Sequence, residues 1–296
     1  MTHRRGDLVL FLLVAFGFSW LVALPLWFDG GLGSPLLPLV GVLMMATPTA
    51  GVLAVWRRER TPAAEFAART GLGLGPRKGR TFALIAAAWL GVPVFAAVTM
   101  AVSDALGLAS LDLSGLGFYH ELLDGLGIQG ADVHTTWLRL FVSGLTIGTL
   151  VTVIPAFGEE WGWRGWLLPR LTDRLGVTRG LLASGVIWGL WHAPLTLLGY
   201  NYANLGAWAA LVFVGFCAVF APVIGWLRLR SGSIWPAVVA HAAFNAVTPS
   251  FLLLGDAGES PNFAIAGPIG LVGWAVFALL GAALLRFRPV RSAVPS

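Results

Sequence analysis

Residues 137–168 read WLRLFVSGLTIGTLVTVIPAFGEEWGWRGWLL, an apolar stretch with two adjacent glutamates and an arginine, Glu159, Glu160 and Arg164, near its C-terminal end. Between Arg139 and Glu159 it contains no charged residue, which is typical of a helix that crosses a lipid bilayer. As one helix the stretch would extend about 48 Å, longer than a straight crossing needs, so we expect a kink at Pro155 and Gly158. The stretch therefore predicts a membrane helix with its acidic groups at one end.

The composition of the whole chain supports this interpretation. Of its 296 residues, 57% are hydrophobic and 11% are charged, whereas a soluble domain usually carries about a quarter charged residues. Eight stretches are apolar and long enough to cross a bilayer: 8–28, 36–56, 81–103, 137–157, 180–199, 206–227, 233–254 and 265–285. The sequence predicts an all-α membrane bundle, one transmembrane domain over residues 1–296, with about eight transmembrane helices and a motif-bearing core at about 137–255.

The positions of the basic residues indicate how these helices are oriented. If the N-terminus lies in the cytoplasm, 18 of the 19 Lys and Arg residues fall in inner loops, and Arg139 alone lies outside. This bias follows the positive-inside rule. We therefore expect a multi-pass protein of the cell membrane with both termini cytoplasmic. The net charge of +5 then reflects topology and contact with anionic lipids, not nucleic-acid binding.

The polar connections and the single cysteine carry weaker signals. Residues 57–80 begin with a plausible amphipathic helix and end rich in glycine, as expected of a segment on the membrane surface. The run His120–Asp124, HELLD, superficially resembles the zinc motif HExxH, but Asp replaces the second His and glycines surround it, so we interpret it as a solvated turn. Cys217 lies in an apolar run and is expected to pack as a small hydrophobe.

Three polar clusters at the apolar segments are candidate functional sites, because ionisable groups at membrane depth are costly. In the first, EEWGWR at residues 159–164, Glu160 and Arg164 have the spacing and order that favour an ion pair on a helix. Glu159 projects about 100° away from Glu160 and stays available for chemistry. The plainer alternative is an ordinary cluster of charges at the membrane interface.

The other two clusters contain histidines. His192 stands in the run 180–200, which has no charged residue, and it could equally be a core histidine with a satisfied partner. His241 and Asn245 lie one helical turn apart on one face, which also suits hydrogen bonding between helices. Together the three clusters supply carboxylates, imidazoles, an amide and a guanidinium, sufficient groups to activate water and stabilise an oxyanion.

These motifs, in this order, resemble those of the CPBP family of intramembrane proteases, which includes the type II CAAX prenyl endopeptidases and bacteriocin-processing or immunity proteins. The family pattern is EExxxR, FxxxH and HxxxN. It is matched here by EEWGWR at 159–164, WGLWH at 188–192 and HAAFN at 241–245. The chain departs from the pattern at Trp188, where the family usually has Phe and where Trp keeps an aromatic wall. The eight-helix count is also similar to the family.

The resemblance implies an intramembrane endopeptidase that acts on a membrane-associated, in some members lipidated, protein or peptide. The implied catalytic residues are Glu159, Glu160, Arg164, His192, His241 and Asn245. In this scheme Glu159 activates the attacking water, supported by Glu160 and Arg164. The two histidines and the asparagine would bind the carbonyl oxygen, the water or a metal. The active site would face, or lie near, the cytoplasmic side.

A metal-dependent mechanism is an open alternative. Glu159, His192 and His241 offer two imidazoles and one carboxylate, a set that suits catalytic zinc. However, a glutamate that binds zinc could not also be the general base, and Glu160 is expected to be tied to Arg164. We therefore favour glutamate-driven hydrolysis without an obligatory metal, with the cofactor otherwise left open.

Two functions outside proteolysis are compatible with the same residues. A non-catalytic immunity or scaffold protein would use the pocket to bind a peptide, and a small proton-coupled transporter would also place Glu, His and Asn at mid-membrane. The transporter is disfavoured because the charges gather at one helix end and no internal repeat is visible. The expected partners are membrane lipids and a membrane-associated substrate; the oligomeric state is left open.

Overall fold

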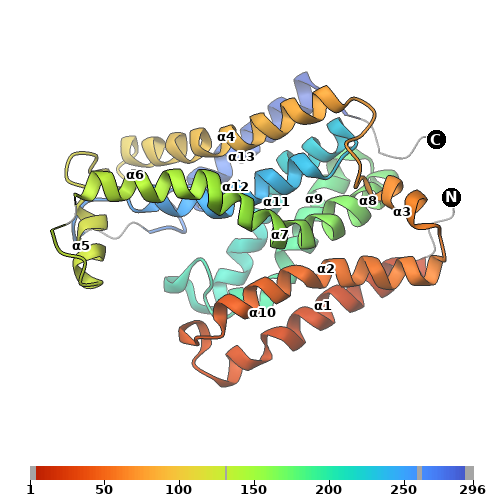
Figure 1. The fold of residues 1–296 in the computed structure, drawn as a ribbon, viewed down its shortest axis with the longest axis horizontal. Coiled ribbons are helices and arrows are strands. Elements are labelled where there is room, and N and C mark those ends of the chain that lie inside the picture. The colour runs from red at the N-terminus through yellow and green to blue at the C-terminus, as the bar shows by residue number, and fades with distance from the viewer. Residues whose placement is uncertain (1–4, 131, 259–261, 291–296) are drawn as a thin grey trace.

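The computed structural model describes residues 5–130, 132–258 and 262–290, and Figure 1 shows their arrangement as a bundle of helices. The longer helices are α1 (Arg5–Phe28), α2 (Leu37–Glu59), α4 (Lys78–Ala105), α6 (Val133–Ser143), α7 (Thr149–Glu160), α9 (Val177–Trp191), α11 (Ala209–Ser231), α12 (Trp235–Leu252) and α13 (Leu271–Phe287). The shorter ones are α3 (Ala63–Thr70), α5 (Gly117–Gly125), α8 (Leu168–Leu175) and α10 (Ala193–Thr196). No strand occurs within the described ranges, which confirms the all-α prediction.

Several of these helices have the length and composition of membrane crossings. In the described part of the chain five qualify: Gly6–Phe28, Leu37–Glu59, Lys78–Ala105, Val133–Leu175 and Ala203–Ser231. A further apolar helix, α13, is shorter, with 17 residues. Among the predicted crossings, 180–199 corresponds to α9, which has 15 residues, and 233–254 to α12, which has 18. A multi-pass membrane protein is therefore supported, while the count of eight stays a prediction.

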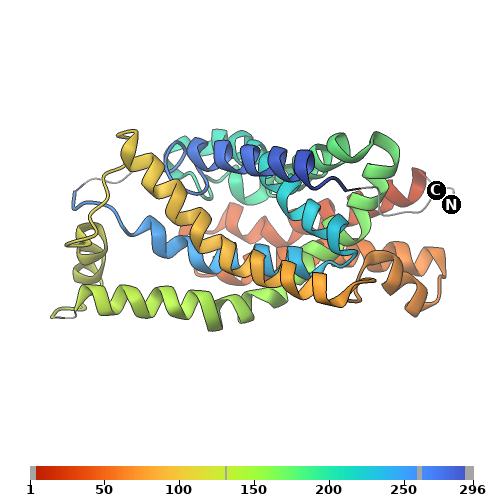
Figure 2. The ribbon, with the colours of Figure 1, turned by 90° about the horizontal axis from the view of Figure 1, so that it is seen from above.

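The orientation can be tested with reporter fusions. In Figures 1 and 2, α3, the start of α1 and the end of α13 lie at one end of the bundle, and α5 lies at the other. Because basic residues gather at the first end, we expect reporters placed at His120 and Gly258 to score extracytoplasmic, and one at Thr70 to score cytoplasmic. A cytoplasmic signal at His120 would overturn the predicted orientation.

The segment Val133–Leu175 forms one continuous helix with two interruptions of its α geometry. Asp132 caps its start by accepting a hydrogen bond from the Thr135 backbone N–H at 2.6 Å, which lowers the pKa of Asp132 below its usual range. The interruptions are π turns at Gly144–Gly148 and Trp161–Leu167. The sequence placed the irregularity at Pro155 and Gly158, but both lie within regular α7. The predicted kink of the helix axis at these residues stays a prediction, and the changes from α to π geometry lie in the glycine-containing turns on either side.

Two glycines bring α7 and the following π turn against α2. A Cβ atom on Gly158 would lie 2.6 Å from the Met45 carbonyl oxygen, and one on Gly162 would lie 2.4 Å from Pro48 Cβ. Glycines four residues apart permit such close approach of helix backbones. Glu159 and Glu160 lie between these glycines, so the glutamates enter the bundle where two helices touch.

The connecting segments match the sequence predictions in part. The short amphipathic helix expected after Arg57 is α3, which buries Phe66. Cys217 is fully buried, as expected of a small hydrophobe. The HELLD run was predicted as a turn and is instead part of the helix α5, because Tyr119 and Leu123 bury one face of it. Its polar side chains lie on the outer face of that helix.

Candidate active site

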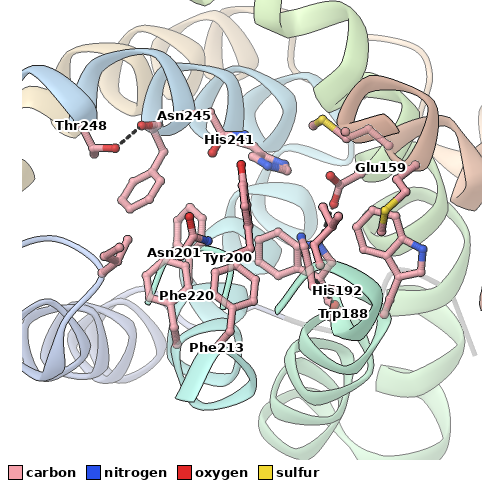
Figure 3. Close-up of a pocket in the computed structure, with 18 of the residues that line it drawn as sticks. Glu159, Trp188, His192, Tyr200, Asn201, Phe213, Phe220, His241, Asn245 and Thr248 are labelled. Atoms are coloured by element: carbon pink, nitrogen blue, oxygen red, sulfur yellow. Dashed lines mark hydrogen bonds between the residues drawn. The ribbon is translucent and has the colours of Figure 1, made fainter. Parts of the chain in front are cut away.

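Four of the six predicted site residues line one pocket, with a volume of about 290 Å³ (Figure 3). They come from three helical segments: Glu159 from α7, His192 from the end of α9, and His241 and Asn245 from α12. The remaining wall is largely apolar and includes Met44, Met45, Phe213, Phe216, Phe220 and Phe244. The structure thus brings together residues that lie up to 86 positions apart in the sequence, although their catalytic roles stay a prediction.

The carboxylate of Glu159 is buried, and one of its two oxygens has a hydrogen-bond donor. Its residue is 2% exposed, and its Oε2 accepts a hydrogen bond from Trp188 Nε1 at 2.7 Å. Figure 3 shows the carboxylate on the pocket wall on the same side as His192 and Trp188. The expectation that Glu159 is free of Glu160 and Arg164 is met, but one of its oxygens has a partner that the sequence analysis did not assign.

Behind the pocket, Glu160 organises a buried charged network. Arg164 Nη1 donates to Glu160 Oε1 at 2.8 Å, and both side chains are fully buried, so the predicted ion pair is confirmed. The same oxygen lies 2.9 Å from His241 Nδ1. Glu160 and Arg164 do not line the pocket itself. They contact two of its lining residues, His241 and Trp188, and the Trp188 ring centroid lies 4.1 Å from the Arg164 guanidinium carbon.

The hydrogen bonds of the two histidines define their neutral forms. His192 Nδ1 lies 2.9 Å from the Trp188 carbonyl oxygen, which can only accept, so Nδ1 carries the proton. Glu160, as the carboxylate partner of Arg164, imposes the same tautomer on His241. Each neutral imidazole therefore has Nε2 as its remaining, unprotonated nitrogen. Such a nitrogen accepts a hydrogen bond from water or takes up a proton.

Asn245 and the end of α9 complete the polar side of the pocket. Asn245 lies one turn beyond His241 on α12, and its side-chain amide is a hydrogen-bond donor at the pocket wall. His192 caps the C-terminus of α9, and the short α10 begins at the next residue, with Pro194 in its first turn. A helix that stops at this depth places the imidazole at the pocket and lets the chain turn away.

The acidic and histidine side chains of the pocket are not arranged as metal ligands. In the ranges that the structure describes, no group of three His, Cys, Asp or Glu side chains is arranged to hold a metal ion. Glu159, His192 and His241 share the pocket without forming such a ligand set. The arrangement therefore does not fit the zinc alternative, and no chemical step is derived through a metal.

One residue of the pocket has contacts that sequence reasoning missed. Trp188 was interpreted as an aromatic wall, yet its indole N–H binds Glu159 and its carbonyl oxygen binds His192. The available signal was the substitution itself, because Trp carries a donor that the family's usual Phe lacks. Met44 and Met45, which reach the pocket from α2, carried no polar signal at all.

Comparison with known proteins agrees with the motifs. Residues 137–247 match the type II CAAX prenyl endopeptidase Rce1-like family, and all three motifs lie within them. A protein named CAAX prenyl protease 2 from Methanococcus maripaludis is 30% identical over 98 residues, which cover 31% of this chain and 36% of that relative. The match thus spans little more than a third of the relative's length. Through residues 137–247, the chain is similar to the type II CAAX prenyl endopeptidase Rce1-like family.

Proposed function

We propose that this protein is an intramembrane endopeptidase in which Glu159 activates the water that attacks a peptide bond. The observation that carries the proposal is the convergence of Glu159, His192, His241 and Asn245 on one apolar pocket. A carboxylate and two imidazoles beside a largely apolar wall provide a base and proton carriers, and an amide provides a donor. The similarity of residues 137–247 to the Rce1-like family supports the same reaction class.

The proposed chemistry follows from which atoms already have partners. With Oε2 held by Trp188, Oε1 of Glu159 takes a proton from water as the water oxygen attacks the carbonyl carbon. Nε2 of His192 accepts a hydrogen bond from the second O–H of the water and so fixes the direction of attack. The protonated Glu159 then returns its proton to the leaving nitrogen as the C–N bond breaks. One water is consumed, and a carboxyl and an amino terminus are released.

The developing oxyanion needs donors on the opposite side of the carbonyl. Asn245 can supply an amide N–H from the next turn of α12. His241 is held by the hydrogen bond between its Nδ1 and Glu160 Oε1, which fixes where its Nε2 faces the reacting group. Glu160 and Arg164 thus serve the reaction from outside the pocket, which explains why charges are buried there at all.

The substrate class is also proposed. The phenylalanine- and methionine-rich wall suits an apolar group next to the scissile bond, and the relative from Methanococcus maripaludis bears the name of a prenyl protease. We therefore propose a lipid-bearing peptide at the membrane surface as substrate. An unmodified peptide lacks the lipid group, whose burial against this wall contributes about 0.8 kcal/mol per CH₂ to binding.

The proposal is tested with purified protein in nanodiscs and a fluorogenic peptide that carries a C-terminal farnesylated cysteine motif, beside its unmodified twin. We expect cleavage of the farnesylated peptide and little of the twin. Activity that survives prolonged chelation would support the glutamate mechanism, whereas loss that zinc restores would contradict it. Binding of the peptide with no cleavage under any condition would overturn the proposed activity in favour of a scaffold role.

A further inference from the structure

Trp188 is the structural centre of the pocket's polar side. Its indole N–H donates to Glu159 Oε2 at 2.7 Å, and its backbone carbonyl accepts from His192 Nδ1 at 2.9 Å. Trp188 and Glu159 are each 2% exposed. A hydrogen bond between an N–H and a buried carboxylate is among the stronger ones in proteins, because water is not present to replace it. One residue therefore holds two of the groups assigned to the attacking water.

The indole ring is itself fixed from several sides. The Arg164 guanidinium carbon lies 4.1 Å from the ring centroid, a close cation–π contact. The His241 ring packs against it edge-to-face, with centroids 5.4 Å apart, and the Phe220 ring is 5.8 Å away. A ring held in this way cannot rotate to follow Glu159. The carboxylate must instead conform to the position of the indole N–H.

We propose that Trp188 is a positioning residue that fixes the Glu159 carboxylate through its indole N–H. The inference rests on the proposed function and adds a device that a Phe at this position would not supply. Holding Oε2 restricts the last side-chain torsion of Glu159 and directs Oε1 toward the water. The carboxylate is then already in its reactive orientation, so less conformational entropy is lost in each turnover. Trp188 does not itself exchange protons with water or substrate.

Trp163 provides a matched control for substitutions of Trp188. Trp163 is fully buried three residues after Glu160, and its Nε1 has no hydrogen-bond partner among the described residues. Trp163 does not line the pocket. Trp163→Phe therefore removes the same atoms as Trp188→Phe and creates a comparable void without breaking an N–H bond to a carboxylate. The two variants differ mainly in the interaction under test.

The first measurement is steady-state cleavage of the farnesylated peptide. Trp188→Phe should lower kcat by about 10- to 100-fold with KM little changed, because a hydrogen bond to a charged group is lost while the apolar wall remains. Trp163→Phe should keep kcat close to wild type. A kcat for Trp188→Phe equal to that of Trp163→Phe, in an enzyme that Glu159→Gln inactivates, would overturn the inference and leave the proposed function standing.

A second variant separates the N–H from the ring. Incorporating β-(3-benzothienyl)alanine at Trp188 keeps the bicyclic shape and the stacking on Arg164 but replaces the N–H by sulfur. It should reproduce the loss of kcat, and it replaces Trp188→Phe if that variant does not fold. Wild-type kcat with this analogue would show that shape alone matters and would overturn the inference.

A third measurement does not depend on activity. In thermal unfolding, Trp188→Phe and Glu159→Ala should be non-additive, since either one removes the same hydrogen bond, whereas Trp163→Phe and Glu159→Ala should add. If the wild-type protein cleaves no peptide, the proposed function fails, and this cycle still decides whether Trp188 holds Glu159. Additive losses for both pairs would overturn the link.

Discussion

Replacing Glu159 by Gln should lower kcat by about 10²- to 10⁴-fold, the range that a positioned general base contributes. The amide oxygen of Gln can still accept the Trp188 N–H, so the buried geometry should persist and the unfolding temperature should stay close to wild type. Cleavage of the farnesylated peptide and thermal unfolding of the same preparation measure the two effects. Loss of activity without loss of stability is the signature expected of the reacting carboxylate.

A surface glutamate provides the control for this substitution. Glu65 in α3 has a side chain 53% exposed and contacts Arg69 at 3.8 Å, far from the pocket walls. Glu65→Gln should change neither activity nor unfolding. If Glu159→Gln were active while Glu160→Gln were inactive and fully stable, the roles assigned to the two glutamates would have to be exchanged.

Glu160→Gln should have a different outcome, a loss of about 3–5 kcal/mol in the free energy of unfolding, because it leaves the Arg164 guanidinium buried without a charged partner. Both side chains are fully buried, and the guanidinium already has two nitrogens, Nε and Nη2, without partners among the described residues. Activity should fall as well, since His241 loses the carboxylate that holds its Nδ1–H and orients the ring. Reversible unfolding in mild detergent gives the stability change.

Removing both charges distinguishes a structural from a chemical role. Glu160→Gln combined with Arg164→Met should recover much of the stability lost in the single variant, because an apolar side chain replaces the unpaired cation. The same double variant should stay poorly active. By comparison, an ion pair that water screens at a protein surface contributes at most about 1 kcal/mol. An unchanged unfolding free energy in Glu160→Gln would contradict the network.

Sequence alone predicted those parts of the site that depend on neighbours along one helix. The Glu160–Arg164 pair follows from spacing and order on a single helix, and the structure confirms it. The bonds from Glu160 to His241 and from Trp188 to Glu159 join residues 81 and 29 positions apart. No periodicity encodes such contacts, because they depend on how helices rotate and slide against one another.

The fold shows the same division. Apolar length correctly predicted an all-helical chain with several helices long enough to cross a membrane, because hydrocarbon thickness sets that length. Local irregularities were less accessible, because nothing in the sequence analysis indicated the π turns that flank α7. Glycines around the HELLD run suggested a turn, but burial of Tyr119 and Leu123 outweighed the cost of glycine in a helix.

A π turn contains one more residue than the α-helical turn that it replaces, so Trp161–Leu167 rotates everything after it by about 100° relative to an unbroken α-helix. Within this turn Trp163 and Trp166 both reach the Phe11 ring of α1, with centroids 5.5 and 4.6 Å away. Deleting a single residue between Gly162 and Gly165 would restore α periodicity and turn that tryptophan face away from α1. The angle about the helix axis between the two glutamates and the tryptophans that pack on α1 therefore depends on the number of residues in this turn. A chain one residue shorter could not restore that angle by changing side chains.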